Sequence, residues 1–270
     1  MRVFDFDSAI VREPAGNVVQ GLRSGAEVPS FDRVLAEHRA YIAALEAAGV
    51  SVETLQAIPD YPDSVFVEDP AFVLPEGAIL LRPGAPSRLG EAASLAPVLD
   101  RRFAHVAMID DGYVDGGDIL VLPGEILVGL SKRTDETGAR RFCDLAAELG
   151  RRARIVEPPP GLLHLKTGCA LIDEATLISV PGMAPLFPGF EVLTVPEDEA
   201  HAANLIRVND RILMGAGFPC TAAMLRNRGL DVVETPAAEI AKIDAGLSCM
   251  SLRWHSSHGC KDRLEVISRG

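Results

Sequence analysis

Apolar residues recur in pairs of short runs along this chain of 270 residues. In each pair, a short turn joins the two runs, which is the pattern of a β-hairpin. Four hairpins are predicted in this way, at residues 66–81, 117–130, 167–180 and 204–216. Three of the turns contain typical turn residues, at Pro123-Gly124, Asp173-Glu174 and Asn209-Asp210.

Predicted helices and single strands separate the hairpins. Apolar residues at helical spacing predict helices at 87–99, 135–149 and 221–228, and extended stretches follow them at 104–108, 153–156 and 230–234. Near the start of the chain, Ser30 is a suitable N-cap for a helix that ends at Gly49 and precedes a strand at 50–55. Strands at 2–11 and 249–254 supply the two arms of a fifth hairpin.

The recurring unit of hairpin, helix and strand predicts a closed ring of five blades. Such repetition marks radial or stacked architectures, and closure leaves few exposed strand edges. The alternative is an open α/β sheet, which would show single strands in place of hairpins. We therefore predict an α/β propeller-like fold and one domain that spans residues 1–270.

Composition and charge narrow the functional classes. Hydrophobic residues make up 48% of the chain and aromatics only 5%, so the core must consist mainly of Ala, Val, Leu and Ile. The net charge of −12 argues against a nucleic-acid partner, which needs a basic face. An acidic balance suits a cationic small molecule, although many proteins are acidic for solubility alone.

The cysteines and the N-terminus indicate a cellular compartment. Five widely spaced cysteines without a C-x-x-C pair predict neither a disulfide framework nor a zinc cluster, and we expect reduced, structural thiols except at Cys249. The first seven residues contain two acids and no apolar segment, so they do not resemble a signal peptide. No apolar run reaches the ~18 residues that a membrane span needs. We expect a soluble cytoplasmic protein without a membrane partner.

Polar motifs fall at the starts of the predicted blades. Asp63, Glu68 and Asp69 precede the first hairpin. Because equivalent strand starts converge on the axis of a ring, these three carboxylates are expected to face one cavity, where they would bind a cation or raise one another's pKa. A solvated loop is an equally good interpretation of this motif alone.

Three further blade starts carry chemically useful residues. Asp115-Gly-Gly-Asp118 allows close backbone approach and positive φ, or simply a tight turn. His164 precedes the third hairpin, and Cys249 lies in the closing strand. A cysteine in an apolar segment is usually a buried hydrophobe. With a histidine and a carboxylate at equivalent positions, it suggests a nucleophile, a base and an orienting acid.

Two arginines, Arg88 and Arg133, follow the first and second hairpins. Arginine is suited to bidentate binding of carboxylates, although either residue taken singly is more simply a surface charge.

These motifs together resemble the dimethylarginine dimethylaminohydrolase family of the guanidine-modifying superfamily. The resemblance extends over nearly the whole chain, through six motifs in the family's order at 63–69, 82–88, 115–118, 129–134, 164–166 and 242–249. It implies the five-bladed α/β propeller known as the pentein fold and a single catalytic domain. It implies no metal and no other cofactor.

The resemblance also implies roles for individual residues. Cys249 would be the nucleophile, His164 the general acid and base, and Asp115 the acid that orients the histidine. The substrate site would comprise carboxylates around the guanidinium, an aromatic wall, two arginines at the α-carboxylate and a segment near the amino-acid end: Asp63, Glu68, Asp69, Phe66, Arg88, Arg133, Ile243 (through its carbonyl) and Asp244. Residues 12–23 resemble the family's lid.

The implied reaction is hydrolysis of a small-molecule substrate, Nω-methylated L-arginine, to L-citrulline and methylamine or dimethylamine through a covalent thiouronium on cysteine. One alternative is a deiminase-like hydrolase of another guanidino compound, in which an Asp would usually stand in place of Lys166. Another is a non-catalytic propeller that binds cationic amino acids, for which Cys249 or His164 would have to be missing, but both are present. Family members occur as monomers and dimers, so a homodimer is among the expectations.

Overall fold

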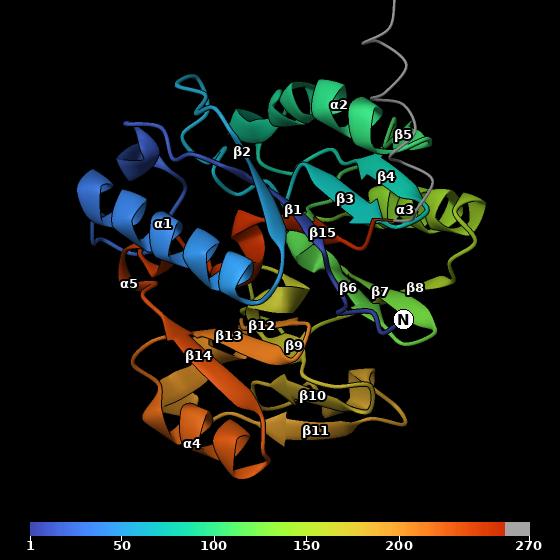
Figure 1. Ribbon diagram of the computed structural model, residues 1–270. Helices are drawn as coiled ribbons and strands as arrows, with labels where there is room; N and C mark the ends of the chain where they lie inside the picture. Colours follow the sequence, from blue (N-terminus) through green and yellow to red (C-terminus); the bar gives the residue numbers. More distant parts are fainter. Residues whose placement is uncertain (257–270) are drawn as a thin grey trace, which may run out of the picture.

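Five three-stranded sheets surround a central axis in the computed structural model, which describes residues 1–256 (Figure 1). In every sheet the first two strands are antiparallel and the third is parallel to the second. The predicted five-bladed α/β architecture is confirmed. Cys260, which we expected to be structural, lies outside the described residues.

The first blade joins the two ends of the chain, as predicted. Its middle strand β1 (Ser8–Arg12) pairs with β15 (Leu252–Trp254) and β2 (Ser51–Leu55). The other blades follow in chain order: β3 (Ala71–Leu74), β4 (Gly77–Leu80) and β5 (Val106–Met108); β6 (Ile119–Leu122), β7 (Glu125–Gly129) and β8 (Ala153–Val156); β9 (Cys169–Leu171), β10 (Thr176–Ser179) and β11 (Glu191–Thr194); β12 (Ile206–Val208), β13 (Arg211–Gly215) and β14 (Asp231–Thr235).

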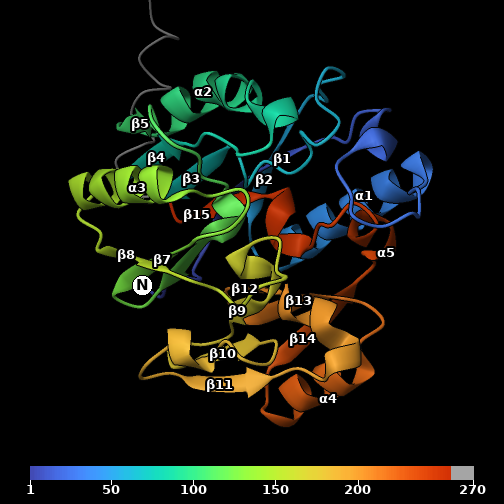
Figure 2. The ribbon, with the colours of Figure 1, turned by 180° about the vertical axis from the view of Figure 1, so that it is seen from behind.

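Helices lie on the outside of the ring, between the second and third strands of four blades (Figure 2). They are α1 (Phe31–Ala47), α2 (Glu91–Arg102), α3 (Glu136–Glu148) and α4 (Pro219–Asn227); a short α5 (Ala238–Ala241) follows β14. The fourth blade has only the 3₁₀ turn η5 (Ala184–Leu186) here, because its connection contains three prolines and two glycines. Within residues 1–256, every helix is too short or too polar to cross a membrane.

Two predicted strands are shorter than expected. The opening strand begins at Ser8 and not at residue 2, because Arg2 and Asp5 form a local turn. The closing strand begins at Leu252, so Cys249 lies in the preceding 3₁₀ turn η7 (Leu247–Met250). Ser30 is at the N-cap of α1, but its side chain does not cap the helix; its backbone N–H instead donates to Glu239.

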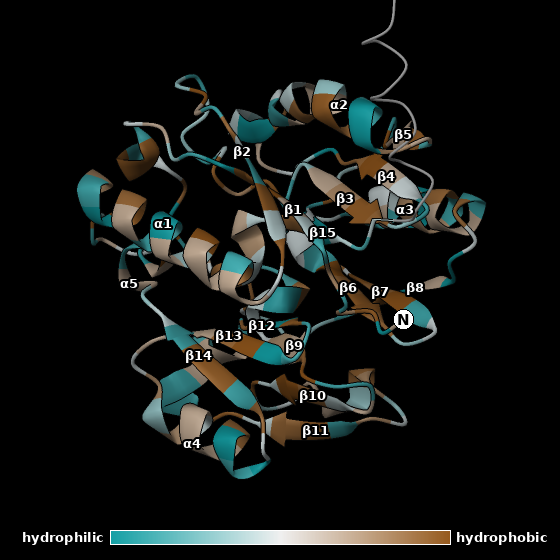
Figure 3. Cartoon of the chain, in the orientation of Figure 1, coloured by the Kyte–Doolittle hydropathy of each residue, from teal (hydrophilic) through white to brown (hydrophobic). Residues whose placement is uncertain are grey.

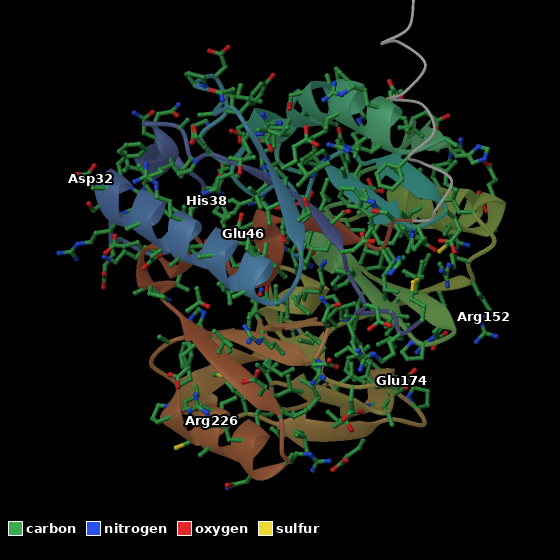
Figure 4. All side chains as sticks on the ribbon, in the orientation of Figure 1. Asp32, His38, Glu46, Arg152, Glu174 and Arg226 are labelled. Carbon is green, nitrogen blue, oxygen red and sulfur yellow. The ribbon has the colours of Figure 1, made fainter. Side chains whose placement is uncertain are left out.

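Aliphatic side chains fill the space between the sheets and the helices, and Figure 3 shows the strands as the most hydrophobic segments. Charged side chains such as those of Asp32 and Arg152 extend outward from the rim (Figure 4). Against this background, a set of charged residues near the axis is almost completely buried, including Arg88, Asp115 and His164. Burying charge is costly unless the groups are paired, so these residues mark a candidate site.

Candidate active site

Short turns before the first strands of the blades carry the predicted chemistry. Asp115 is the N-cap of η3 (Gly116–Asp118), which leads into β6, and His164 is the N-cap of η4 (Leu165–Thr167), which precedes β9. Cys249 lies in η7 before β15. Because the ring places equivalent strand starts near its axis, residues far apart in the sequence come together there.

His164 is paired with Asp115, as predicted. Its Nε2 lies 2.9 Å from Oδ2 of Asp115, while Oδ1 of Asp115 accepts from the backbone N–H of Gly84 at 2.7 Å. Burial disfavours the imidazolium, but the hydrogen bond to Asp115 and the charge of Asp69 outweigh it and raise the pKa of His164 to about 9. At neutral pH, His164 is therefore protonated and able to act as an acid.

The two glycines after Asp115 allow close contacts. A Cβ on Gly117 would lie 2.6 Å from Nδ1 of His164, and one on Gly116 would lie 1.9 Å from the carbonyl oxygen of Glu68. The predicted close approach is therefore confirmed. The positive φ that these glycines would allow is not used, because both lie outside the left-handed region.

Asp69 completes an acidic corner beside the histidine. It accepts from Arg88 at 2.5 Å and from the backbone N–H of Gly117 at 3.1 Å, and the nearby positive charge of Arg88 holds the pKa of Asp69 low despite its burial. One polar atom from each of Asp69, Asp115 and His164 lies within 4.8 Å of the others. At neutral pH a metal ion would have to displace the proton of His164 before the imidazole could ligate it.

Cys249 is held by backbone contacts on both sides. Its N–H donates to Gly246 at 3.3 Å, and its carbonyl accepts from the N–H of Glu68 at 3.2 Å. Burial, followed by the negative charges of Asp69 and Glu68, raises the pKa of the Cys249 thiol. Without a bound cation, the sulfur is therefore a neutral thiol near neutral pH.

A cavity of about 40 Å³ brings the predicted residues together. It is lined by ten of the eleven predicted site residues and by three others: Asp63, Phe66, Asp69, Arg88, Asp115, Arg133, His164, Ile243, Asp244, Cys249, Leu22, Leu163 and Ala245. We call it the catalytic cavity. As it stands, it has room for a few water molecules only.

Glu68 is the predicted site residue that does not line the catalytic cavity. Its Oε1 lies 2.5 Å from Nζ of Lys166 and 3.3 Å from Nη2 of Arg253, and it borders a separate cavity of about 200 Å³. The expectation that three carboxylates face one cavity is therefore wrong for Glu68, because two cations draw its side chain elsewhere. Cys249 and His164 line the smaller cavity and not the larger one, so the predicted catalytic residues meet in the smaller one.

The two predicted carboxylate-binding arginines differ in their surroundings. The guanidinium of Arg88 is buried between Asp69 and Glu91 and also donates to the carbonyls of Asp63 and Phe66. The guanidinium of Arg133 has no hydrogen bond or ion pair within residues 1–256, although it lines the catalytic cavity. Arg133 is therefore the more available of the two for an anionic group of a ligand, and both roles stay predictions.

Sequence reasoning assigned no role to Asp118, which is fully buried. Its carboxylate accepts from the hydroxyls of Ser131 and Thr134, both at 2.7 Å, and from the N–H of Leu165 at 2.8 Å. It thus joins the loop that contains Arg133 to the turn that follows His164. The second acid of the Asp-Gly-Gly-Asp motif was the signal for this role.

Leu22, in the predicted lid, and the nearby Ser24 form hydrogen bonds with residues that line the catalytic cavity. The N–H of Leu22 donates to Asp63 at 3.0 Å, and Ser24 donates to Asp244 through its N–H at 2.6 Å and its hydroxyl at 2.8 Å. Asp244 has a φ of 54°, an uncommon conformation for a residue with a side chain. The Ser24 contact lies one residue beyond the predicted lid, and the sequence pattern there did not reveal it.

Comparisons with known proteins agree with these features. A family model described as "N,N dimethylarginine dimethylhydrolase, eukaryotic" matches residues 23–151. The N(G),N(G)-dimethylarginine dimethylaminohydrolase of Pseudomonas aeruginosa is 37% identical over 254 residues, or 92% of this chain and 100% of that protein. The protein of the same name from Streptomyces coelicolor is 35% identical over 253 residues, or 91% of this chain and 96% of that protein.

Solved structures are similar over the same extent. The Pseudomonas aeruginosa enzyme, as a cysteine-to-serine variant complexed with citrulline, has a TM-score of 0.90 at 37% identity and covers 93% of this chain and 100% of its own. A histidine-to-glycine variant of a dimethylarginine dimethylaminohydrolase, as an adduct with S-methyl-L-thiocitrulline, has a TM-score of 0.89. The N-terminal domain of a cyanobacterial arginine dihydrolase, 19% identical with a TM-score of 0.82, shares the fold.

Proposed function

This chain belongs to the dimethylarginine dimethylaminohydrolase family, and from that premise we propose that it hydrolyses Nω-methylated L-arginine to L-citrulline and methylamine or dimethylamine. It is a hydrolase that acts on a C–N bond of a guanidine. The observation that carries the proposal is the catalytic cavity, which is lined by a cysteine, a protonated histidine paired with an acid, and further carboxylates.

Substrate binding would depend on charge and on lid opening. The guanidinium is a planar cation, and Asp63 and Asp69 would accept hydrogen bonds from it in its plane beside the ring of Phe66. Because the closed cavity is too small for an amino acid, the contacts from Leu22 and Ser24 must break before the substrate enters.

The amino-acid end of the substrate would be held near the lid. Arg133 and Arg88 would face the α-carboxylate. The carbonyl of Ile243 and the carboxylate of Asp244 would face the α-ammonium. These groups line the same cavity as the sulfur of Cys249, so a single substrate molecule would contact both them and the sulfur.

Covalent chemistry would begin when the substrate's positive charge lowers the pKa of Cys249 and the thiol releases its proton to solvent. The thiolate attacks the guanidinium carbon and forms an S–C bond. His164 then gives its proton to the departing amine as the C–N bond breaks, which leaves a thiouronium on the sulfur. Neutral His164 next takes a proton from a water that attacks the same carbon, and the S–C bond then breaks. The thiolate leaves, and the new C–OH group releases its proton to solvent to give citrulline.

The test is turnover of arginine, monomethylarginine and asymmetric dimethylarginine by the purified protein, measured as citrulline formation. We expect the methylated substrates to be faster and Cys249→Ser to abolish turnover while retaining citrulline binding. Faster turnover of arginine would assign the protein to the deiminases. Binding of cationic amino acids without any turnover would indicate a non-catalytic propeller.

We also propose that the protein acts in the cytoplasm without nucleic-acid or membrane partners, and that two copies form a homodimer. The net charge of −12 supports the absence of nucleic-acid and membrane partners, because phosphate backbones and anionic lipids repel an acidic protein. The family's mixture of monomers and dimers is the ground for the second part. Light scattering during gel filtration would measure the mass, and a monomer at all concentrations would refute the dimer.

A further inference from the structure

Arg253, which has no predicted role in the site, contacts the backbone of the turn that carries Cys249. Its side chain is only 12% exposed. Its Nη1 lies 3.2 Å from the carbonyl oxygen of Ser248, 2.9 Å from that of Ser251 and 2.6 Å from the hydroxyl of Ser251. One guanidinium therefore binds the backbone on both sides of Cys249.

The turn that carries Cys249 depends on such outside contacts. A 3₁₀ turn has poorer hydrogen-bond geometry than an α-helix, and η7 is only four residues long. Within the turn, the N–H of Cys249 bonds the carbonyl of Gly246. The carbonyls of Ser248 and Ser251 receive their donors from Arg253.

Arg253 also connects the turn to the segment opposite. Its Nη2 lies 3.3 Å from Oε1 of Glu68, and the N–H of Glu68 donates to the carbonyl of Cys249. Tyr41 supports the same group, because its hydroxyl bonds that of Ser251 at 2.6 Å. The guanidinium of Arg253 thus contacts Ser248 and Ser251, which lie close to Cys249 in the sequence, and Glu68, which lies close to it in space.

We propose that Arg253 is a positioning residue for Cys249: by binding the carbonyls of Ser248 and Ser251 together with the Glu68 carboxylate, it fixes the direction in which the sulfur attacks. This inference rests on the proposed function, because the direction of the sulfur matters only when it attacks a guanidinium carbon. Charge neutralisation of Glu68 is a weaker explanation for Arg253, since Lys166 already lies 2.5 Å from the same carboxylate oxygen.

The experiment compares Arg253→Lys, which keeps the charge but loses the fork of N–H donors, with Arg253→Met, which loses both. Arg154→Lys is the matched control. Arg154 likewise bonds a carboxylate, that of Glu125, and a carbonyl, that of Leu186, but it lies on the outer strand β8. We expect the control to retain full activity.

For Arg253→Lys we expect kcat to fall by about 10- to 100-fold with little change in KM, because a small misplacement of a reacting group costs rate more than binding. We also expect faster alkylation of Cys249 by iodoacetamide at high pH, because a looser turn exposes the sulfur. Peptide mass spectrometry distinguishes Cys249 from the exposed Cys220.

The pH dependence of alkylation separates positioning from charge. We expect the midpoint to stay unchanged in Arg253→Lys, which keeps the charge, and to rise only slightly in Arg253→Met, because Lys166 still neutralises Glu68. The other charged groups around the thiol are the same in both variants: Asp69, Lys166, His164, Asp63, Arg88, Asp115, Arg133 and Asp244.

A wild-type kcat and a wild-type alkylation rate in Arg253→Lys would overturn the proposal. A loss of citrulline binding and thermal stability in proportion to the loss of kcat would also overturn it, because such a loss indicates a general structural role. If the unaltered protein turns over none of the three arginines, the proposed function fails. The alkylation experiment still decides the role of Arg253 in that case, because it needs no substrate.

Discussion

Replacement of Asp115 by Asn tests the link between buried charge and the acid role of His164. In the structure both oxygens of Asp115 accept, one from His164 and the other from Gly84. An asparagine keeps the shape but removes the negative charge, and its amide nitrogen cannot accept from either donor. The variant is therefore expected to fold while it changes the protonation of His164.

The size of the effect follows from the present pKa of His164. A value of about 9 means that His164 is almost fully protonated at pH 8. Loss of a carboxylate in direct contact lowers a histidine pKa by about 1–3 units, and the middle of that range gives a value of about 7. The protonated fraction at pH 8 then falls by roughly tenfold, which corresponds to about 1.4 kcal/mol of lost acid catalysis.

The assay is kcat for asymmetric dimethylarginine as a function of pH, together with the chemical shifts of the His164 ring in both proteins. We expect the basic limb of the kcat profile to move to lower pH by the same amount as the ring titration. Asp110→Asn is the matched control, because the Asp110 carboxylate is exposed and pairs with Arg141 away from the axis. A basic limb that stays in place while activity falls would refute the argument.

Three further predictions concern pH, the lid and close packing. In the folded protein the pKa of His164 is about 9, above its ordinary value of 6.5. The stability that protonated His164 contributes is therefore complete below pH 6.5 and is lost as the pH rises through 9. The raised pKa of Cys249 also lowers the stability at high pH. Urea unfolding should therefore show lower stability at pH 9.5 than at pH 6.5, by on the order of 3 kcal/mol from His164, and a smaller difference in His164→Asn. Ser24→Ala removes one of the two hydrogen bonds from Ser24 to Asp244. Steady-state kinetics should show that KM rises about 3- to 10-fold while kcat is not lowered. A lower kcat with the same KM would contradict a lid role. Gly117→Ala places a methyl against the ring of His164 and should reduce kcat at least about 100-fold, whereas Gly25→Ala, which meets nothing within 4 Å, should be neutral in the same assay.

The ring could be predicted from the sequence because each blade is encoded locally. The arms of a hairpin such as 117–130 and its Pro-Gly turn are neighbours in the chain, so their pattern does not depend on distant residues. The pairing of β1 with β15 could be predicted only because a ring of five blades needs the two ends of the chain to form the remaining hairpin. The fourth blade shows the limit, since β11 comes after a loop with no periodic pattern and was not predicted.

The site could be predicted as a set of residues, but the direction of individual side chains could not. Glu68 and Asp69 are adjacent acids in one turn, so nothing in their sequence context indicated that only Asp69 would line the catalytic cavity. Lys166 and Arg253, which come from two other blades, decide the direction of Glu68 through ion pairs. Likewise, Cys249 follows an apolar pattern that continues into β15, and its 3₁₀ turn depends on donors from Glu68 and Arg253.

The same contacts explain why a buried thiol can remain both neutral and ready to react. Asp69 and Glu68 oppose ionisation of Cys249, while Lys166 favours it. A guanidinium carbon placed about 3.5 Å from the sulfur would contribute about 4–5 kcal/mol at an effective dielectric constant of about 20, or roughly three pKa units. This stabilisation of the thiolate is larger than the stabilisation from any single ion pair at a protein surface. Because this would lower the pKa of Cys249 from about 12 to about 9, the binding of a cation would raise the thiolate fraction at neutral pH by roughly a thousandfold, whereas a neutral ligand would leave it unchanged.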